Sequence, residues 1–232
     1  MRRLARILGT VLILAGVGTL AWAVTVWQWQ DPFTAVVNRL EQRELSQSLE
    51  RSFDRAAPVA PTASVSPTEL RRILKREARA WRSRAKRGDA VARIRVSRLG
   101  LDGVVVNGTD TASLKRGPGR YLGSAMPGEG ALVYIAGHRT TYGAPLSRID
   151  RLRKGDKVTL ELPYGTLVYE ITGHKIVKAT ELSVLKSRGR EELALQACEP
   201  RFFASHRYIA YAKPVSFAPP GGSTQTTSFA AG

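Results

Sequence analysis

From about residue 89 onward, the sequence alternates short apolar runs with turns rich in glycine, proline and aspartate. Runs of this length, rich in valine, isoleucine and tyrosine, are typical of β-strands. We expect strands at 92–97, 101–106, 131–136, 158–162, 167–172, 176–179, 193–198 and 208–212, and a short helix at 145–152. Short strands with little helix between them predict a mainly β fold, an eight-stranded β-barrel over 89–215 that is closed or nearly closed.

The N-terminal segment is mostly apolar and free of charge from Ile7 to Trp27. About 20 apolar residues in a helix cross a bilayer, so this run is long enough to span one. Arginines at positions 2, 3 and 6 precede it, which favours a cytoplasmic N-terminus. Ala21-Trp22-Ala23 has the form of a signal-peptide cleavage site, but the apolar run continues past it. We therefore expect residues 1–29 to be an uncleaved single-pass membrane anchor, with the rest of the chain outside the cytoplasm.

Residues 30–88, between the anchor and the barrel, are expected to form stalk helices joined by a linker. Pro32 suits the first position of a helix, and apolar residues then recur at helical spacing as far as Phe53. The stretch from 56 to 67 is rich in Pro, Ala, Ser and Thr and indicates a linker. A second helix is expected over 68–87, and the Gly-, Pro-, Ser- and Thr-rich stretch 216–232 is expected to be a disordered tail.

The chain is strongly basic, with a formal net charge of +17. Such a charge favours an anionic partner: nucleic acid, anionic lipid or a bacterial wall polymer. The sequence contains no motif of a nucleic-acid-binding module, so we expect no nucleic-acid partner. The helix expected over 68–87 carries nine basic and two acidic residues. Both a solvated surface and a contact with wall polymer or lipid headgroups fit this pattern.

Cys198 is the only cysteine of the chain, which excludes an intrachain disulfide and a cysteine-rich zinc site. A lone cysteine is most often a small buried apolar residue. Here, however, it ends an apolar run, while Arg207 opens the next expected strand and His138 follows the strand expected at 131–136. A thiol, an imidazole and a guanidinium at neighbouring strand ends have the chemistry of a covalent acyl-transfer site. We expect these three residues to be catalytic.

Other histidines and arginines offer alternatives. His174 is expected to be an exposed polar residue in a turn, whereas His206 adjoins Arg207 and is a second candidate for the site. The histidines and Cys198 contain no closely spaced ligand pair, so we expect no metal and no cofactor. Arg201 is an alternative to Arg207; the latter is preferred because it directly opens a strand, where its side chain can be fixed.

Three further residues near these segments receive a structural interpretation. Arg139, next to His138, is expected to be a structural or surface arginine. Tyr121 and Tyr134 are candidates for lining a substrate groove, but aromatic residues in strands are more often part of the core.

Several segments carry a family pattern. The histidine segment is Ala136-Gly137-His138-Arg139-Thr140-Thr141-Tyr142-Gly143-Ala144-Pro145, and the second segment has Cys198, Pro200, Phe202 and Arg207. The others are Leu99-Gly100-Leu101, Val104-Val105-Val106, Gly108-Thr109-Asp110 and Leu114-Lys115-Arg116-Gly117-Pro118-Gly119. In this order, over about 93–213, they resemble the sortase family, most closely the class E sortases of high-GC Gram-positive bacteria. One segment departs from the family: sortases usually have Thr-Leu-x-Thr-Cys, where this chain has Leu195-Gln196-Ala197-Cys198.

The resemblance implies a sortase-like β-barrel and transpeptidation. A sortase cleaves a C-terminal sorting signal of surface proteins between Thr and Gly, typically Leu-Pro-x-Thr-Gly, or Leu-Ala-x-Thr-Gly in many class E members. It holds the Thr as a thioester and passes it to an amine of the peptidoglycan precursor. The implied roles are nucleophile for Cys198, proton carrier for His138 and binding of carbonyl or oxyanion for Arg207. The implied partners are surface proteins, the precursor amine and, through the N-terminal helix, the cytoplasmic membrane.

Other functions fit the pattern less well. An L,D-transpeptidase would have Ser-x-Gly-Cys before its arginine, a motif that this chain lacks. A papain-like wall peptidase would have its cysteine before its histidine, the opposite of the order here. A non-enzymatic alternative is a catalytically degenerate, membrane-anchored sortase-fold module that binds anionic wall polymer. The absence of the two threonines favours this alternative, and the complete Cys, His and Arg set argues against it.

Overall fold

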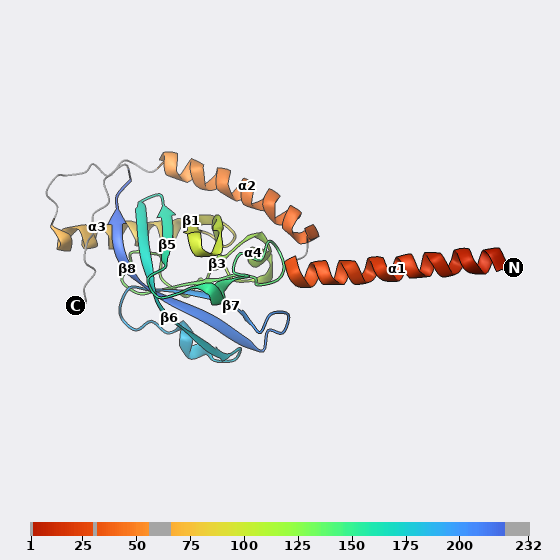
Figure 1. Ribbon diagram of the computed structural model, residues 1–232. Helices are drawn as coiled ribbons and strands as arrows, with labels where there is room; N and C mark the ends of the chain where they lie inside the picture. Colours follow the sequence, from red (N-terminus) through yellow and green to blue (C-terminus); the bar gives the residue numbers. More distant parts are fainter. Residues whose placement is uncertain (1, 30–31, 56–65, 221–232) are drawn as a thin grey trace.

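Eight strands close into a β-barrel in the order β1-β2-β3-β4-β7-β8-β6-β5, with β5 paired back to β1 (Figure 1). The computed structural model describes residues 2–29, 32–55 and 66–220. The strands are β1 Ala90–Val96, β2 Leu101–Asn107, β3 Gly119–Arg120, β4 Leu132–Ala136, β5 Lys157–Leu162, β6 Gly165–Lys178, β7 Glu192–Glu199 and β8 His206–Ala218. The pairs β2–β3 and β4–β7 are parallel, and the other pairs are antiparallel. The prediction of a mainly β, eight-stranded barrel is confirmed.

The set of strands differs from the expected one in two places. β6 joins the stretches 167–172 and 176–179 into one 14-residue strand. A bulge between Ile171 and Gly173 shifts the register of β6 against β8 without ending the ladder. β3 is absent from the expected set because a strand of two residues shows no periodicity in the sequence. The number of strands therefore agrees with the expectation although the membership differs.

The short helix expected at 145–152 is reduced to one 3-10 turn, η2 (Ile149–Arg151). Backbone hydrogen bonds here join residues three apart: Ile149 N donates to Leu146 O, and Leu152 N donates to Ile149 O. Because a 3-10 helix repeats every three residues, this winding directs Leu146, Ile149 and Leu152 to one side, where all three are buried.

The strands that carry the candidate site are buried on both faces. On β7, Leu193, Leu195 and Ala197 belong to the core inside the barrel, while Ala194 belongs to a second apolar cluster on the outer face. Members of that cluster also come from β4, β6 and β8, and it is covered by the 3-10 helix η3 (Leu182–Leu185). Burial on two faces explains why β4 and β7 have continuous apolar sequences instead of alternating ones.

Helix α1 (Arg2–Trp29) projects away from the barrel (Figure 1). Residues 2–24 of this helix, with arginines only at positions 2, 3 and 6, are by length and composition a candidate membrane span, and none of this stretch is buried within the protein. The large apolar side chains described along it, from Leu4 to Val24, are all exposed. A contiguous exposed apolar surface of this size is typical of a site that contacts a membrane or another protein.

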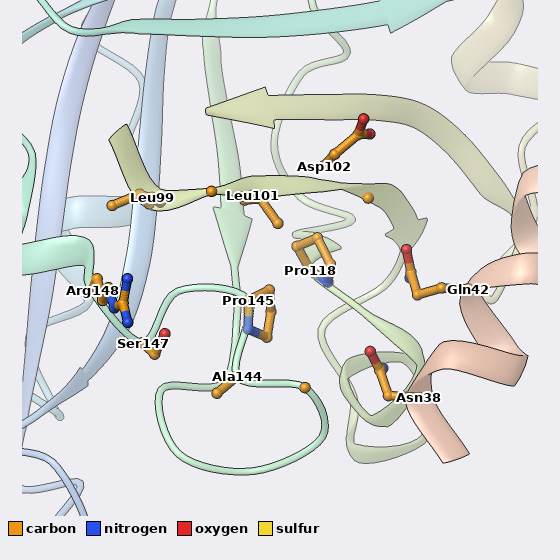
Figure 2. A pocket seen from close by; sticks show the side chains of 13 residues that line it. Asn38, Gln42, Leu99, Leu101, Asp102, Pro118, Ala144, Pro145, Ser147 and Arg148 are labelled. Atoms are coloured by element: carbon orange, nitrogen blue, oxygen red, sulfur yellow. The ribbon is translucent and has the colours of Figure 1, made fainter. Parts of the chain in front are cut away.

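Helix α2 (Pro32–Arg55) packs along the barrel. Leu45 and Leu49 are buried against the outer face of β1 and β2. Gln42 completes the backbone bonding of β2: its side chain accepts a hydrogen bond from Val104 N at 2.7 Å and donates to Val104 O at 3.2 Å and Arg116 O at 2.7 Å. Near its N-terminal end, Figure 2 shows Asn38 and Gln42 beside Pro118 and Pro145 around a small cavity. The helix is therefore fixed to the barrel by specific contacts.

Helix α3 (Pro67–Arg84) covers another part of the barrel. Leu70, Leu74 and Ala78 join the main core, and Trp81 Nε1 donates a hydrogen bond to Val91 O at 3.1 Å. The helix ends at Arg84, before the expected end at 87. A short fourth helix, α4 (Thr111–Arg116), precedes β3.

The boundary expected at 215 lies inside the last strand. β8 continues through Ala218, and Phe217 is buried in the core, so residues 216–218 belong to the barrel and not to a tail. The remaining expected tail residues 221–232 and most of the expected linker, 56–65, lie outside the described residues.

Replacing Leu49 with alanine is expected to destabilise the protein by about 2–5 kcal/mol, because it removes a fully buried side chain between α2 and the barrel. Leu40→Ala on the same helix is the matched control, since Leu40 is 60 % exposed. Denaturant unfolding of the detergent-solubilised full chain measures both changes. Equal effects of the two substitutions would contradict the docking of α2.

Candidate active site

The register of β7 and β8 places Cys198 directly opposite Arg207. Alternation along β7 turns Leu195 and Ala197 into the barrel core and Cys198 to the outer face. On β8, Ile209 belongs to the outer cluster, so Arg207 shares that face. Directly opposed residues of an antiparallel pair have Cβ atoms about 4.5–5.5 Å apart. The thiol and the guanidinium therefore extend from neighbouring positions, and Cys198 is only partly buried.

His138 reaches the same end of the barrel from β4. Because β4 and β7 are parallel, their C-terminal ends lie together, with Ala136 paired to Gln196. Gly137 N then donates a hydrogen bond to Gln196 O at 2.9 Å. His138 follows as the next residue, and Cys198 lies two residues beyond Gln196. The fold thus brings to one end of the barrel three residues that lie 60 and 9 positions apart in the sequence.

The His138 ring is partly buried. Burial lowers the pKa of the imidazole, because the charged form loses hydration. Its Nε2 atom is buried and has no hydrogen-bond partner among the described residues. The ring lies 5.1 Å from the Tyr142 ring, at an angle of 42°. A neutral imidazole with an uncommitted nitrogen is suited to accept a proton and to return it to a leaving group.

Arg139 connects the histidine segment to the cysteine strand. Its side chain is 6 % exposed and forms ion pairs with Glu199 and, at 2.8 Å, with Asp150. It also donates a hydrogen bond to the backbone oxygen of Cys198 at 3.2 Å. The structural interpretation of this residue fits these contacts, but the sequence does not show what it holds together. Arg139 therefore joins the segment after β4 to the end of β7 and to Asp150.

Replacing Arg139 with lysine is expected to lower kcat about 10-fold or more, because a small misplacement of a catalytic group costs reaction rate. A lysine keeps the charge but lacks the planar fork that serves both carboxylates and the carbonyl. A positioning role predicts a fall in kcat with little change in KM, whereas a purely structural role lowers only the melting temperature. Arg148→Lys, an exposed arginine in the segment after His138, is the control.

The two candidate oxyanion donors have different surroundings. Arg207 Nη1 donates hydrogen bonds to Ala204 O at 2.7 Å and His206 O at 2.9 Å, which fixes one side of the guanidinium. Arg201 lies 5.9 Å from the Phe202 ring and has a buried Nε without a partner. Only Arg207 is a register partner of Cys198. The preference for Arg207 over Arg201 therefore agrees with the strand register.

The remaining histidines do not share the strand face of Cys198 and Arg207. His174 lies within β6, opposite Ala210, and not in a turn as expected; its ring stacks on Tyr208 at 4.9 Å. β6 continues past the bulge between Ile171 and Gly173 and through His174. His206 faces Glu199 across the ladder and bonds Ser205, so alternation turns it away from the face of Arg207. The described ranges 2–29, 32–55 and 66–220 contain no group of three His, Cys, Asp or Glu side chains suited to hold a metal.

The two tyrosines considered for a groove belong to the packed outer cluster. Tyr134 is buried, and Tyr121 packs against it edge to face with ring centroids 6.5 Å apart. Burial raises the pKa of the Tyr134 hydroxyl, while the positive charge of Arg207 acts in the opposite direction. Arg207 is therefore close enough to this hydroxyl to influence it electrostatically.

The residues that replace the usual threonines are both buried in apolar clusters. Ala197 is fully buried in the barrel core and Ala194 in the outer cluster. A side chain at position 197 points away from the face of Cys198, since neighbouring strand residues alternate. An alanine there also leaves no buried hydroxyl in need of a partner. Position 197 thus lies behind the nucleophile, whereas position 194 lies on the same face of β7 as Cys198, where its alanine is buried in the outer cluster.

The chain matches the Sortase domain family over residues 94–215. Sortase D of Bacillus subtilis (strain 168) is 35 % identical over 133 residues, which cover 56 % of this chain and 66 % of that protein. Sortase SrtE1 of Streptomyces coelicolor is 31 % identical over 109 residues, or 42 % and 31 % of the two chains. The matches thus span about two thirds and one third of these relatives' own lengths.

Solved structures show the same fold. Sortase E from Streptomyces avermitilis has a TM-score of 0.53 and 34 % identity, covering 58 % of this chain and 93 % of that one. The Clostridium perfringens Sortase D5 transpeptidase has a TM-score of 0.60 and 22 % identity, covering 75 % and 98 %, and it shows likeness of fold alone. Relatives of both the D and the E kind are therefore among the matches.

Proposed function

Because the chain belongs to the sortase family, we propose that it is a cysteine transpeptidase that acts on sorting signals. The observation that carries this proposal is the pairing of Cys198 with Arg207 across β7 and β8, beside the end of the strand that leads to His138. The proposed substrates are surface proteins with a C-terminal Leu-Pro-x-Thr-Gly or Leu-Ala-x-Thr-Gly signal. The proposed acceptor is an amine of a peptidoglycan precursor.

The first half of the reaction forms a thioester. His138 takes the thiol proton of Cys198, and the sulfur attacks the carbonyl carbon of the signal threonine. The carbonyl oxygen becomes an oxyanion, which Arg207 stabilises by hydrogen bonding and charge. When the tetrahedral intermediate collapses, the Thr–Gly carbon–nitrogen bond breaks, and His138 delivers its proton to the departing glycine amine.

The second half transfers the acyl group. The acceptor amine attacks the thioester carbon and loses a proton to His138. The carbon–sulfur bond then breaks, and the sulfur recovers its proton from the imidazole. The lowered pKa of His138 supports both halves, since a neutral ring accepts a proton and gives it up readily. No cofactor enters the proposed reaction.

We further propose that α1 anchors the protein in the cytoplasmic membrane. The candidate span covers residues 2–24, and the arginines at positions 2, 3 and 6, at its start, favour a cytoplasmic N-terminus. This arrangement places the barrel outside the cytoplasm, on the side where surface proteins and wall precursors meet. Protease digestion of sealed spheroplasts tests the orientation, because only an external barrel is degraded.

Intact mass spectrometry tests the activity. The full chain in detergent is mixed with peptides that contain Leu-Ala-x-Thr-Gly or Leu-Pro-x-Thr-Gly, with and without glycine or a diamino acid as acceptor. We expect an adduct on Cys198 with the mass of the peptide up to its threonine, which the amine removes. If no sorting peptide forms the adduct while the protein binds wall polymer, the result would favour the non-enzymatic alternative.

A further inference from the structure

The connection between β7 and β8 exposes two adjacent aromatic side chains. Phe202 is 49 % exposed and Phe203 is 71 % exposed. Among the residues described in the barrel and its loops, no large apolar side chain is more exposed than Phe203. Phe202 has a φ of 72°, a conformation that residues with a side chain rarely adopt, and Phe203 N donates to Pro200 O within the same turn. The turn holds both rings outside the core instead of folding them in.

A chain of contacts connects this loop to the start of α2. The loop follows Glu199, which is paired with Arg139, the neighbour of His138. Next to His138 in space lies the Tyr142 ring. The backbone N–H of Tyr142 donates a hydrogen bond to the Thr34 hydroxyl at 2.9 Å. The first turn of α2 is thereby fixed to the end of the barrel that carries the candidate active site.

The same end of the barrel lies close to the end of α1. An extended chain covers at most about 3.6 Å per residue, so Thr34 is within about 18 Å of Trp29. Helix α1 ends at Trp29. In Figure 1 the connection between β7 and β8, coloured blue, lies on the side of the barrel from which α1 leaves, whereas α3 lies at the opposite side. If α1 crosses the membrane, this end of the barrel faces the membrane surface.

The chemistry of this end suits a lipid interface. Along the sequence, the two exposed rings lie between Arg201 and Arg207. The exposed Lys115 lies 5.6 Å from the Tyr142 ring. Aromatic rings at the level of the headgroups, with basic side chains beside them, are typical of surfaces that lie in the interface of an anionic membrane. Two acidic groups of this region, Asp150 and Glu199, are both paired with Arg139, which reduces their repulsion of anionic lipid.

We propose that the loop 200–205 inserts Phe202 and Phe203 into the outer leaflet of the membrane that α1 spans. This inference rests on the proposed anchoring by α1. Two attachments, the helix and the loop, hold the barrel in one orientation, with Cys198 at the membrane surface. The sorting signal would then be cleaved next to the bilayer, and a substrate that is itself held in the membrane meets the thiol at a high local concentration.

Depth-dependent fluorescence quenching tests the insertion. In the full chain with Cys198→Ala, Phe203→Cys supplies a single thiol for an environment-sensitive nitrobenzoxadiazole label. The protein is reconstituted in vesicles of phosphatidylglycerol and phosphatidylethanolamine that contain doxyl-labelled lipid. We expect the label at 203 to lose most of its fluorescence to a quencher placed near the headgroups. Leu182→Cys is the matched control, because Leu182 is also a highly exposed apolar residue, 67 % exposed, but lies on η3.

A third label separates this inference from the anchoring proposal. Leu14→Cys, in the middle of the apolar stretch of α1, must be quenched by a doxyl group deep in the acyl chains if α1 spans the bilayer. Quenching at 14 with none at 203 would overturn the loop insertion and leave the anchor intact. Absence of quenching at 14 would overturn the anchor. Equal quenching at 203 and 182 would also overturn the insertion. So would a label at 203 that a sorting peptide shields in detergent but that lipid does not quench in vesicles.

Discussion

Replacing Cys198 with alanine is expected to abolish both cleavage of a sorting peptide and transfer to an amine, because no acyl-enzyme can form without the thiol. The expected loss is complete within detection, since the structure has no other cysteine to replace it. Liquid chromatography of the peptide products measures it. Cys198→Ser is the companion variant: a hydroxyl beside an imidazole retains the shape of the site but is a much weaker nucleophile, so its activity should also be near background.

The Cys198 variants should fold like the natural chain. The side chain is only partly buried and lies at the end of β7, so its removal leaves no large cavity. An unchanged melting temperature together with the lost activity would support a chemical role. Residual turnover in Cys198→Ala equal to that of the natural protein would exclude Cys198 as the nucleophile and with it the proposed reaction.

Replacing Arg207 with lysine is expected to reduce kcat/KM about 10²- to 10³-fold, the usual effect of losing one donor to a developing oxyanion. One nitrogen of the Arg207 guanidinium donates hydrogen bonds to two backbone carbonyls. These bonds fix the orientation of the planar guanidinium opposite Cys198. An ammonium group keeps the charge but cannot hold these carbonyls and also reach the substrate in a defined direction. Steady-state kinetics with a fluorogenic sorting peptide measures the change.

Arg201→Lys is the control for this experiment. Arg201 lies in the same loop region, but it has no register partner at the thiol and lies beside Phe202. We expect it to change kcat/KM far less than Arg207→Lys does. A larger effect of Arg201→Lys would transfer the role of oxyanion donor to Arg201, the alternative that the sequence leaves open.

Much of the site was predictable because its chemistry depends on residue types and on their distance from strand ends. The strand that ends before His138, the strand that ends in Cys198 and the strand that begins near Arg207 all have clear apolar patterns. The contacts of Arg139 were not predictable. Asp150 and Glu199 lie 11 and 60 positions away from it, and nothing in the local sequence indicates that they meet.

The same distinction applies to the N-terminal helices. Residue spacing predicts the helix that begins at Pro32, and composition predicts an apolar span before it. The contact of Gln42 with β2 and the bond between Thr34 and Tyr142 join residues 62 and 108 positions apart. A glutamine and a threonine on a helix surface look like ordinary polar residues until the barrel is placed beside them.

The sequence by itself determined the apolar N-terminal segment, the position of most strands and the choice of Cys198, His138 and Arg207 as candidate site residues, because periodicity, charge and side-chain chemistry are local properties. Only the tertiary structure decided that Cys198 faces Arg207, that Ala197 points into the core and that the segment after His138 is bonded to the start of α2. These facts follow from strand register and barrel closure. They depend on which distant segments become neighbours, and a one-residue shift in register would reverse every side chain of β7.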